Sequence, residues 1–356
     1  MVVVGAGIVG CACAWELASR GVSVCLIDRG AVSSGTTGLG EGNVLCCDKR
    51  PGPELGLAVR GLAMYEEIEE LLGEEAGIRR KGALVVHSDP GSWAAEPERV
   101  AALQAAGVRC SLLTAEEVRE AEPALSGPLL GASWFPDDLQ CNPRAIARGL
   151  ARLAAARGAV IETGREVDSV RALPAQHAVI AAGVWSAPLA ASAGLELPLE
   201  PRKGQLVRLE RRPDFLRHKV IDGGYTAAVE SEDAGLQVST VIETTLDGHV
   251  LVGSSRERKG FDTTVDPAVS AALLKAAARL APAIADLEID SAWAGLRPWL
   301  PGGLPAIGPT KAADGLFIAT GHEGAGIAHG PITGRLVAQA ICGEPTDLPL
   351  APFSPD

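Results

Sequence analysis

A glycine-rich segment at the start of the chain constrains the fold more than any other feature. Gly5, Gly7 and Gly10 stand between the apolar run Val2 to Val4 and a helical pattern that ends near Gly21. The pattern predicts a buried strand, a tight turn and a helix. Glycine allows the turn, lets the backbone approach a pyrophosphate, and lets helix and strand pack closely. The helix N-terminus then offers N–H groups to a diphosphate, so the segment predicts a dinucleotide site.

The end of the second strand narrows the choice of dinucleotide. Val22 to Asp28 reads as that strand, and its last residue is the acid expected to bind a ribose 2′-hydroxyl. A carboxylate at this place disfavours NADP because a 2′-phosphate would be repelled. A tight turn without any ligand is the structural alternative. FAD and NAD both remain open, since the same loop serves both cofactors.

The length of 356 residues suits two domains whose segments alternate along the chain. Strand and helix patterns like those of the start recur late in the sequence, whereas segments between them alternate in the manner of antiparallel strands open on one face. We expect an α/β fold with a Rossmann-like nucleotide-binding domain and an inserted antiparallel-sheet substrate domain. The nucleotide-binding domain is predicted to comprise residues 1–75, 135–200 and 290–356, and the substrate domain 76–134 and 201–289.

Two late segments carry more specific expectations. Glu166 to Arg171 reads as a short strand, and the last helix is predicted over Pro331 to Ile341, after a glycine-rich turn.

Composition excludes several functions. A net charge of −12 without a basic stripe argues against nucleic acid. Eight cysteines form no C-x-x-C pair and no zinc spacing, so we expect free thiols and no metal. No apolar run is long enough to cross a bilayer and no signal peptide is visible, which predicts a cytoplasmic protein. Only Cys46 and Cys47, adjacent in a polar loop, could face a partner; ordinary loop thiols are the alternative.

Several motifs, in a characteristic order over nearly the whole length, carry a family resemblance. They are Gly5 to Gly10 with Asp28, Ser34 to Gly38, Ala181 to Ser186, Arg202 to Gln205, Gly295 to Pro298, Gly303 to Gly308, and Gly321 to Ile327. With these motifs the chain resembles the D-amino-acid oxidase-like family of flavoproteins, which includes glycine and sarcosine oxidases. Two segments, Gly40 to Leu45 with Asp48 and Lys49, and His322 to Gly326, are most similar to the FAD-bearing subunits of D-hydroxyproline dehydrogenases and opine oxidases.

The resemblance implies FAD as the cofactor and a set of residues that would bind it. These are Gly5, Gly7, Ile8, Val9, Gly10, Asp28, Arg29, Ser34, Gly35, Thr36, Thr37, Gly42, Asn43, Val167, Ala182, Gly183, Trp185, Gly204, Gly324, Ala325, Gly326 and Ile327. The glycine-rich turn before the last helix would face the electron-rich edge of a reduced flavin, although a purely structural turn is the alternative.

Three residues are candidates for the catalytic site. Arg297, predicted to follow a buried strand, matches the family arginine that grips a substrate carboxylate, and its planar fork suits a bidentate contact. The alternative is a structural ion pair with one of the many acids. His322 and Glu323 could border the substrate cavity, but a structural histidine is equally expected at 322 or 329.

The resemblance implies hydride transfer from the substrate C–H beside nitrogen to flavin N5, which gives an imine. Monomeric sarcosine oxidases attach FAD through a cysteine in the segment that resembles Ala294 to Arg297, and this chain has none there. We therefore expect non-covalent FAD. Those oxidases also place a lysine over the flavin; the strand Val252 to Ser255 lacks one, which favours a dehydrogenase or a weak oxidase.

Three functions compete at this stage. The first is a flavoenzyme that oxidises a small D-amino acid, cyclic imino acid or N-alkylated glycine. The second is an electron-transfer subunit that depends on other chains, such as a partner carrying an iron–sulfur centre or a second flavin. The third is an NAD-dependent dehydrogenase.

Overall fold

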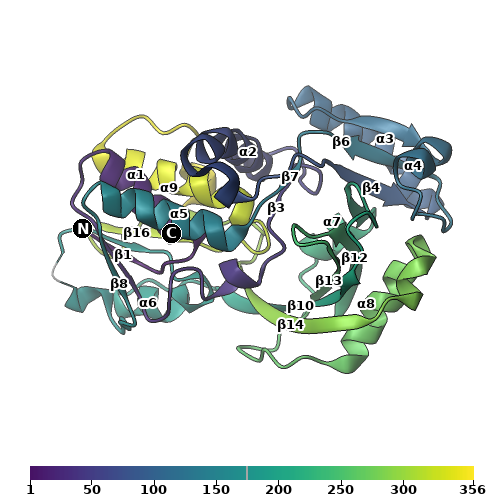
Figure 1. Cartoon of the computed structure of the whole chain (residues 1–356). Coiled ribbons are helices and arrows are strands. Elements are labelled where there is room, and N and C mark those ends of the chain that lie inside the picture. The colour runs from purple at the N-terminus through teal and green to yellow at the C-terminus, as the bar shows by residue number, and fades with distance from the viewer. Residues whose placement is uncertain (174) are drawn as a thin grey trace.

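The structure, a computed structural model, describes residues 1–173 and 175–356, with the side chains of all of these except 227 and 230. Figure 1 shows two sheets side by side, with both termini on the side of the smaller sheet. The smaller sheet has six strands and the larger one eight. The alternation of segments predicted from the sequence is therefore visible as two β-layers that share one chain.

The six-stranded sheet is parallel except at one edge, where β15 runs antiparallel to β16. In spatial order its strands are β15 (Ala306–Pro309), β16 (Leu316–Thr320), β9 (Ala178–Ile180), β1 (Val2–Val4), β2 (Cys25–Asp28) and β8 (Val160–Thr163). The central strands are short, apolar and buried on both faces, as expected for parallel strands covered by helices.

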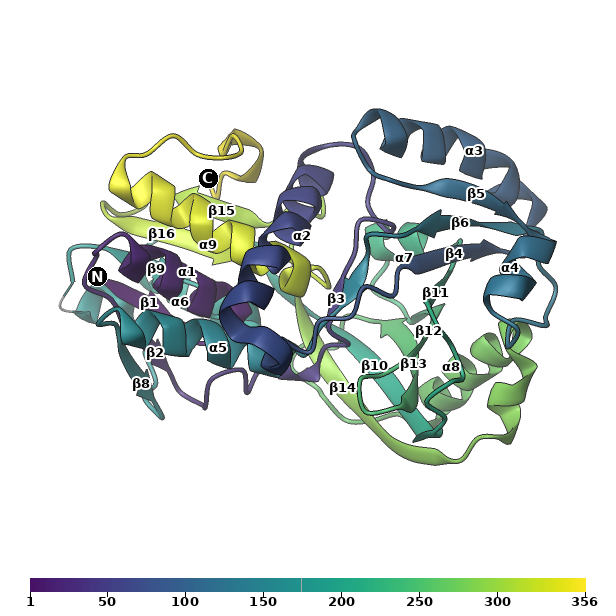
Figure 2. The same ribbon diagram turned by 45° about the horizontal axis from the view of Figure 1, so that its top comes forward.

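Helices cover both faces of this sheet (Figures 1 and 2). On one face lie α1 (Ile8–Ser19), α5 (Pro143–Ala156) and α9 (Gly326–Cys342), which share one apolar core. On the other face lies the short α6 (Ser186–Ser192), packed with the inward side chains of β1, β9 and β16. This two-faced covering is the nucleotide-binding architecture that the glycine segment predicts.

The eight-stranded sheet is antiparallel apart from one parallel pair, β4 with β11. In spatial order its strands are β14 (Ile289–Trp299), β10 (Glu200–Arg211), β13 (His249–Arg256), β12 (Gln237–Thr244), β11 (Lys219–Asp222), β4 (Ala83–His87), β6 (Gly131–Phe135) and β5 (Ser111–Thr114). Four helices accompany this sheet: α3 (Pro90–Ala105), α4 (Ala115–Ala121), α7 (Tyr225–Glu230) and α8 (Pro267–Leu280).

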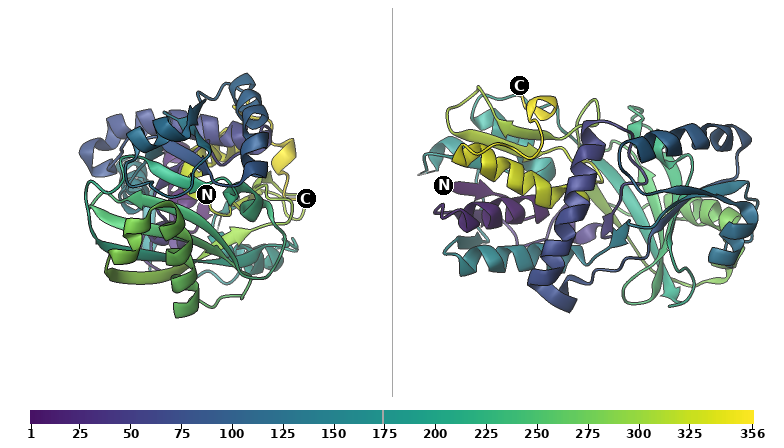
Figure 3. Two further views of the ribbon diagram at one scale, coloured as in Figure 1. Left: turned by 90° about the vertical axis from the view of Figure 1, so that its right-hand side faces the viewer. Right: turned by 90° about the horizontal axis from the view of Figure 1, so that it is seen from above.

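Two elements join the halves. The two-stranded pair β3 (Asn43–Val44) and β7 (Leu139–Gln140) lies beside α2 (Pro53–Leu72), which crosses the molecule between the sheets when seen from above (Figure 3).

Strand β14 lies in the larger sheet, although the predicted division assigns 290–356 to the nucleotide-binding part. Its pairing with β10 along nearly its whole length explains the placement; the division into domains itself stays a prediction.

The last helix begins earlier than predicted, at Gly326, with Pro331 inside it. Proline has no N–H for the carbonyl four residues before it, here that of Ile327. The buried Tyr65 hydroxyl donates to this carbonyl at 2.7 Å. At Gly61, one turn earlier in α2, a Cβ would lie 2.0 Å from the Ala328 oxygen. Close packing against α2 therefore accommodates the proline that sequence reasoning took as a helix start.

The predicted strand Glu166 to Arg171 is wrong. Strand β8 forms the edge of the smaller sheet, so the segment after it has no neighbouring strand to pair with. Its only regular element is the 3-10 turn η3 (Val170–Ala172).

Candidate functional site

One continuous cavity of about 570 Å³ runs between the two sheets. It begins at the glycine turn and the end of β2, passes the segment 34–43, and ends at β10, β14 and the turn before α9. Nearly all the predicted cofactor-binding and catalytic residues line it; Gly10 and Ala325 do not. The fold therefore brings together motifs that are separated by up to three hundred residues.

The glycine turn is fixed by sterics. Gly5 has φ +109°, and a Cβ there would lie 2.4 Å from the Ala181 oxygen. A Cβ on Gly10 would lie 1.7 Å from the Gly5 oxygen, so this glycine permits the approach of α1 to the turn rather than lining the cavity. Gly7 lines the cavity at the start of α1, where a Cβ would meet the Thr37 hydroxyl at 3.1 Å. Backbone is thus exposed where a diphosphate would approach.

Two side chains from outside the glycine segment, Asp28 and Thr37, accept hydrogen bonds from its backbone. The Asp28 carboxylate accepts from the N–H groups of Ala6 at 2.6 Å and Gly30 at 2.7 Å. The Thr37 hydroxyl accepts from the Ile8 N–H at 3.0 Å, which provides the side-chain cap that α1 lacks within its own sequence. Asp28 lines the cavity, so its remaining lone pairs could accept from a ribose hydroxyl.

The segment around Thr36 bridges the two sheets. It forms the short 3-10 helix η1 (Thr36–Leu39) inside the loop predicted from sequence. The Thr36 hydroxyl donates to the Leu296 oxygen at 2.7 Å, and the Trp293 indole donates to the Leu39 oxygen at 2.9 Å. Since Thr37 caps α1, one turn of chain couples the glycine loop to β14.

A small cluster closes the cavity near β8. The Arg29 guanidinium lies over the Trp185 ring, 4.3 Å from its centroid, and pairs with Glu166 at 3.5 Å. The Trp185 ring stacks on Phe261 with centroids 6.1 Å apart. Arg29, Trp185 and Glu166 line the cavity together with Asp28, whereas Phe261 stacks on Trp185 without lining it.

Arg297 lies at the opposite end of the cavity. It belongs to β14 itself rather than following a strand, and it faces Arg202 of β10 in register. Its Nη1 donates to the Ser255 oxygen at 2.9 Å. A Cβ on Gly204 would lie 2.1 Å from that nitrogen, so the glycine leaves room for the guanidinium to lie across β10. Gly204 lines the cavity as predicted and also supports this arginine.

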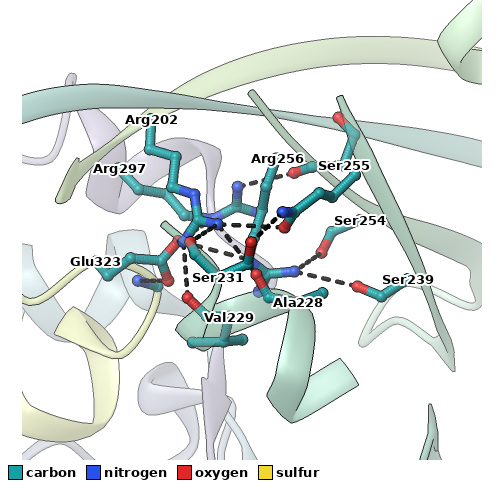
Figure 4. Close-up of polar contacts among 12 residues, drawn as sticks. Arg202, Ala228, Val229, Ser231, Ser239, Ser254, Ser255, Arg256, Arg297 and Glu323 are labelled. Atoms are coloured by element: carbon teal, nitrogen blue, oxygen red, sulfur yellow. Dashed lines mark hydrogen bonds and ion pairs between the residues drawn. The ribbon is translucent and has the colours of Figure 1, made fainter. Parts of the chain in front are cut away.

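Glu323 stands among three arginines (Figure 4). Its Oε1 lies 3.6 Å from Arg202, 3.5 Å from Arg256 and 3.8 Å from Arg297. Burial alone would raise the pKa of this carboxyl, but the three guanidinium groups outweigh it and hold the pKa below its ordinary value. Arg297 therefore has an acidic neighbour, as the structural expectation requires, and it also lines the cavity; its contact with a substrate carboxylate stays a prediction.

Arg202 and Arg256 are each 1% exposed and lie behind the cavity wall. Arg202 donates to the backbone oxygens of Ala228, Val229 and Ser231, at 2.8–3.0 Å. Burial, opposed by Glu323, lowers the pKa of Arg202 to about 10. Arg256 stacks on the Tyr225 ring at 4.5 Å. With three cations around one carboxylate, this end of the cavity carries a net positive charge suited to an anionic group.

His322 lines the cavity but is 5% exposed, and its Nε2 lies 2.9 Å from the Thr333 hydroxyl. Burial lowers the pKa of His322 to about 4, so the ring is neutral at physiological pH. His329 is also buried, 6.3 Å from His322 between ring centroids, and burial lowers its pKa as well.

Sequence reasoning missed three polar residues near the substrate end: Glu41, Lys219 and Tyr225. Glu41 and Tyr225 line the cavity, and Lys219, 1% exposed, forms an ion pair with Glu41. A lysine at the start of a β-branched run, Lys219 to Ile221, was the one available signal, because such a residue needs a buried acid. The acid lies 178 positions away and could not be found by spacing.

The Cys46 and Cys47 expectation is corrected. Both side chains are buried, 2% and 0% exposed, and their N–H groups donate to the Asp138 carboxylate. Burial raises the pKa of Asp138 to about 7. The cysteines pack in an apolar core with Leu55 and Phe135, so they do not face a partner.

All eight cysteines are free thiols. Within residues 1–173 and 175–356, no group of three His, Cys, Asp or Glu side chains is arranged to hold a metal ion. Across the same described ranges, no helix combines the length and apolarity needed to cross a membrane.

Comparison with known proteins agrees with the geometry. Residues 1–340 match the model of the DAO family, described as FAD dependent oxidoreductase. The chain is 31% identical to glycine oxidase of Pseudomonas aeruginosa, over 100% of this chain and 98% of that protein. The crystal structure of glycine oxidase from Geobacillus kaustophilus is 29% identical, with a TM-score of 0.89 over 100% of this chain and 97% of that one.

A second solved structure, iminodiacetate oxidase from Chelativorans sp. BNC1, is 27% identical, with a TM-score of 0.84 over 99% of this chain and 98% of that one. The expected resemblance to D-hydroxyproline dehydrogenase and opine oxidase subunits stays a prediction. The family match extends over most of the chain, and the glycine turn, the bridging segment and Arg297 occupy one cavity. The chain therefore belongs to the DAO family of FAD-dependent oxidoreductases.

Proposed function

We propose that this FAD-dependent enzyme oxidises the C–N bond of a small amino or imino acid, whose carboxylate binds Arg297. One observation carries the proposal: the Arg297 guanidinium, with two buried arginines behind it, ends the same cavity that starts at the glycine turn. Glycine oxidases and an iminodiacetate oxidase among the relatives give support, since their names describe small amines bearing carboxylates.

The residues present fit FAD. At Gly7 the cavity reaches the backbone at the start of α1, where a diphosphate could approach the N–H groups closely. A side chain at this position would crowd Thr37, so only glycine leaves the backbone open. When bound, FAD would supply the two-electron oxidation as the hydride acceptor for the carbon beside nitrogen. The predicted set from Gly5 to Asn43 would hold the adenosine and diphosphate of FAD. Gly324, Gly326 and Ile327 would lie against its flavin ring.

The side chains around the substrate end bind and orient rather than transfer protons. Arg297 can donate from Nη2 to a carboxylate while Nη1 stays on the Ser255 oxygen. His322 is neutral at physiological pH because its pKa is about 4. A neutral ring adds no positive charge to the part of the cavity that it lines.

The direct test is anaerobic bleaching of the flavin absorption band by a panel of small D-amino acids, cyclic imino acids and N-alkylated glycines. We expect at least one member to bleach the band within the time of mixing. A panel without any bleaching, on protein that carries a full complement of flavin, would contradict the proposed reaction.

Replacing Arg297 separates binding from folding. We expect Arg297→Ala to raise KM by two orders of magnitude or more, because a charge-assisted bidentate contact to the carboxylate is lost. Arg297→Lys keeps the charge without the planar fork and should restore part of the loss. Steady-state kinetics and the flavin content of each variant are the measurements. Near-normal KM in Arg297→Ala would remove this residue from the substrate site.

The acceptor and the state of the flavin remain proposals. We expect non-covalent FAD that is released by heat denaturation, and slow peroxide formation in air, since electrons would pass to another carrier. A partner subunit with an iron–sulfur centre or a second flavin, and a cytoplasmic location, stay predictions; burial of Cys46 and Cys47 removes the surface feature that suggested the partner.

A further inference from the structure

The proposed function assigns no residue to the substrate nitrogen, and one charged group at the substrate end is still unexplained. Glu41 lines the cavity and its side chain is 14% exposed. We infer that the Glu41 carboxylate binds the substrate nitrogen in the cationic form in which it arrives from solution, so that Arg297 and Glu41 together select zwitterionic amino and imino acids. The bound nitrogen would then lose its proton to solvent before the carbon beside it is oxidised. This inference rests on the proposed function.

The two oxygens of Glu41 have different surroundings. Oε2 accepts from the Asn43 amide at 2.6 Å and from Lys219 Nζ. Oε1 lies against Gly253 of β13, where a Cβ would be 3.1 Å from it. Within the part of the chain that the structure describes, no group donates a hydrogen bond to Oε1. One oxygen is therefore anchored and the other is left for a ligand.

Glu41 and Arg297 reach the same strand. Arg297 Nη1 bonds to the Ser255 oxygen, and Glu41 Oε1 lies against Gly253, two residues earlier on β13. Gly204 and Gly253 lie on the neighbouring strands β10 and β13. A Cβ on Gly204 would overlap Arg297, and a Cβ on Gly253 would meet Leu206 at 2.5 Å and Glu41, so the missing side chains leave room for both charged groups. A positive and a negative group are thus presented a short distance apart over one face of the sheet, as a small zwitterion requires.

A buried row of alternating charges fixes Glu41 from behind. Lys219 lies 3.5 Å from Glu243 Oε1, and Lys81 lies 2.7 Å from Glu243 Oε2. Gln140 donates to Glu243 Oε2 at 2.7 Å. Because Glu243 and Lys81 balance each other, Lys219 is left to neutralise Glu41, and the four charges sum to zero.

Glu41 is ionised in this setting. Burial alone would raise its pKa, but Lys219, Asn43 and Arg297 outweigh burial and hold the pKa below its ordinary value. A carboxylate of this kind is a weak proton acceptor and a good counter-ion. Its role is therefore to recognise a protonated amine, in preference to a hydroxyl or ether oxygen at the same place in a ligand.

Matched ligands test this on the holoenzyme reduced with dithionite under argon, where no turnover can occur. N-methylglycine and methoxyacetate differ only in the cationic nitrogen, and proline and tetrahydrofuran-2-carboxylate form a second pair. By calorimetry, we expect wild type to bind the nitrogen member of at least one pair tenfold or more tightly. In Glu41→Gln we expect that preference to fall to about one, with the affinity for the oxygen member retained.

Two further variants keep the test decisive. Glu166→Gln removes a carboxylate from the other end of the same cavity and should keep the preference. Glu41→Asp retains the charge beside Lys219 and should weaken binding of the nitrogen member alone, which covers a failure of Glu41→Gln to fold.

The outcomes separate the two proposals. Equal affinities within both pairs in wild type, or a preference unchanged in Glu41→Gln, would overturn the inference and leave the proposed function standing. Failure of every ligand to bind to wild type would overturn both.

Discussion

The two walls of the cavity present different kinds of groups to a ligand. On the side of the smaller sheet the wall is mostly backbone: glycines at 5 and 7 allow close approach, and Asp28 and Thr37 serve the turn itself. On the side of the larger sheet, Arg202, Arg256 and Lys219 are each about 1% exposed and act through charge. A cofactor of constant shape can be met by sterics, whereas a small polar substrate is distinguished by where its charges lie.

The difference also changes what each wall tolerates. A buried charge is costly unless a partner stays beside it, so removing one member of a buried pair harms more than the pair contributes. The glycine turn does not depend on buried charges. Its conformation is lost when an added side chain overlaps the neighbouring backbone. Steric changes should therefore damage the first wall, and charge neutralisation the second.

The largest effect is expected from Gly10→Ala. Its Cβ would lie 1.7 Å from the Gly5 oxygen, so the glycine turn must move and the diphosphate contact is lost. We expect protein purified with little or no flavin, measured as the ratio of flavin to protein absorbance. Gly56→Ala is the control, since its Cβ would meet only Leu348 at 3.7 Å. Full flavin content in Gly10→Ala would show that the turn is not sterically determined.

Glu243→Gln should destabilise the protein by disturbing the buried charges on the side of the larger sheet. It leaves Lys81 and Lys219 buried with one carboxylate fewer, and we expect a loss of about 3–5 kcal/mol of unfolding free energy. Chemical denaturation measures it. The exposed pair Arg152–Glu75 gives the matched control, because solvent screens it and Glu75→Gln should leave the unfolding free energy nearly unchanged. Equal losses in the two variants would contradict the role assigned to burial.

The smallest effect concerns His322, between the two walls. Its pKa falls from an ordinary 6.5 to about 4 in the folded state, so the unfolded chain binds a proton first as pH falls. Stability should therefore decrease between pH 6.5 and 4, by up to about 3 kcal/mol. We expect His322→Gln to make this dependence less steep, with the buried His329 causing part of what remains, and the exposed His177→Gln to leave it unchanged. An equally steep curve in His322→Gln would show that other groups cause it.

Local patterns predicted the nucleotide side well. The glycine spacing indicated the turn. Asp28 was found because the acid that binds a ribose hydroxyl is expected at the end of the second strand of such a unit, and β2 ends there. Errors arose where packing overrode local preference: Pro331 lies inside α9 because Tyr65 and Gly61 accommodate it.

The substrate side was predicted far less completely. Arg297 was identified through its motif, but Arg202 and Arg256 were not proposed as part of the site, and Tyr225 was taken for an ordinary residue. The positions of the arginines depend on the register of β10, β13 and β14, which pair residues 38 to 99 positions apart. A strand pattern gives alternation but not register, so the arginines could not be aligned on Glu323 from sequence.

What the sequence determined by itself is the chemistry that depends on backbone conformation. Glycines in fixed spacing, followed by an acid, specify a turn whose geometry is local, and the ordered motifs identify the flavoprotein family. Only the tertiary structure decided which charges share one site, namely Arg297 with Glu323 and Glu41 with Lys219. Conformation is set by neighbours in the chain, whereas a buried charge is set by its partners in space, which the fold alone brings together.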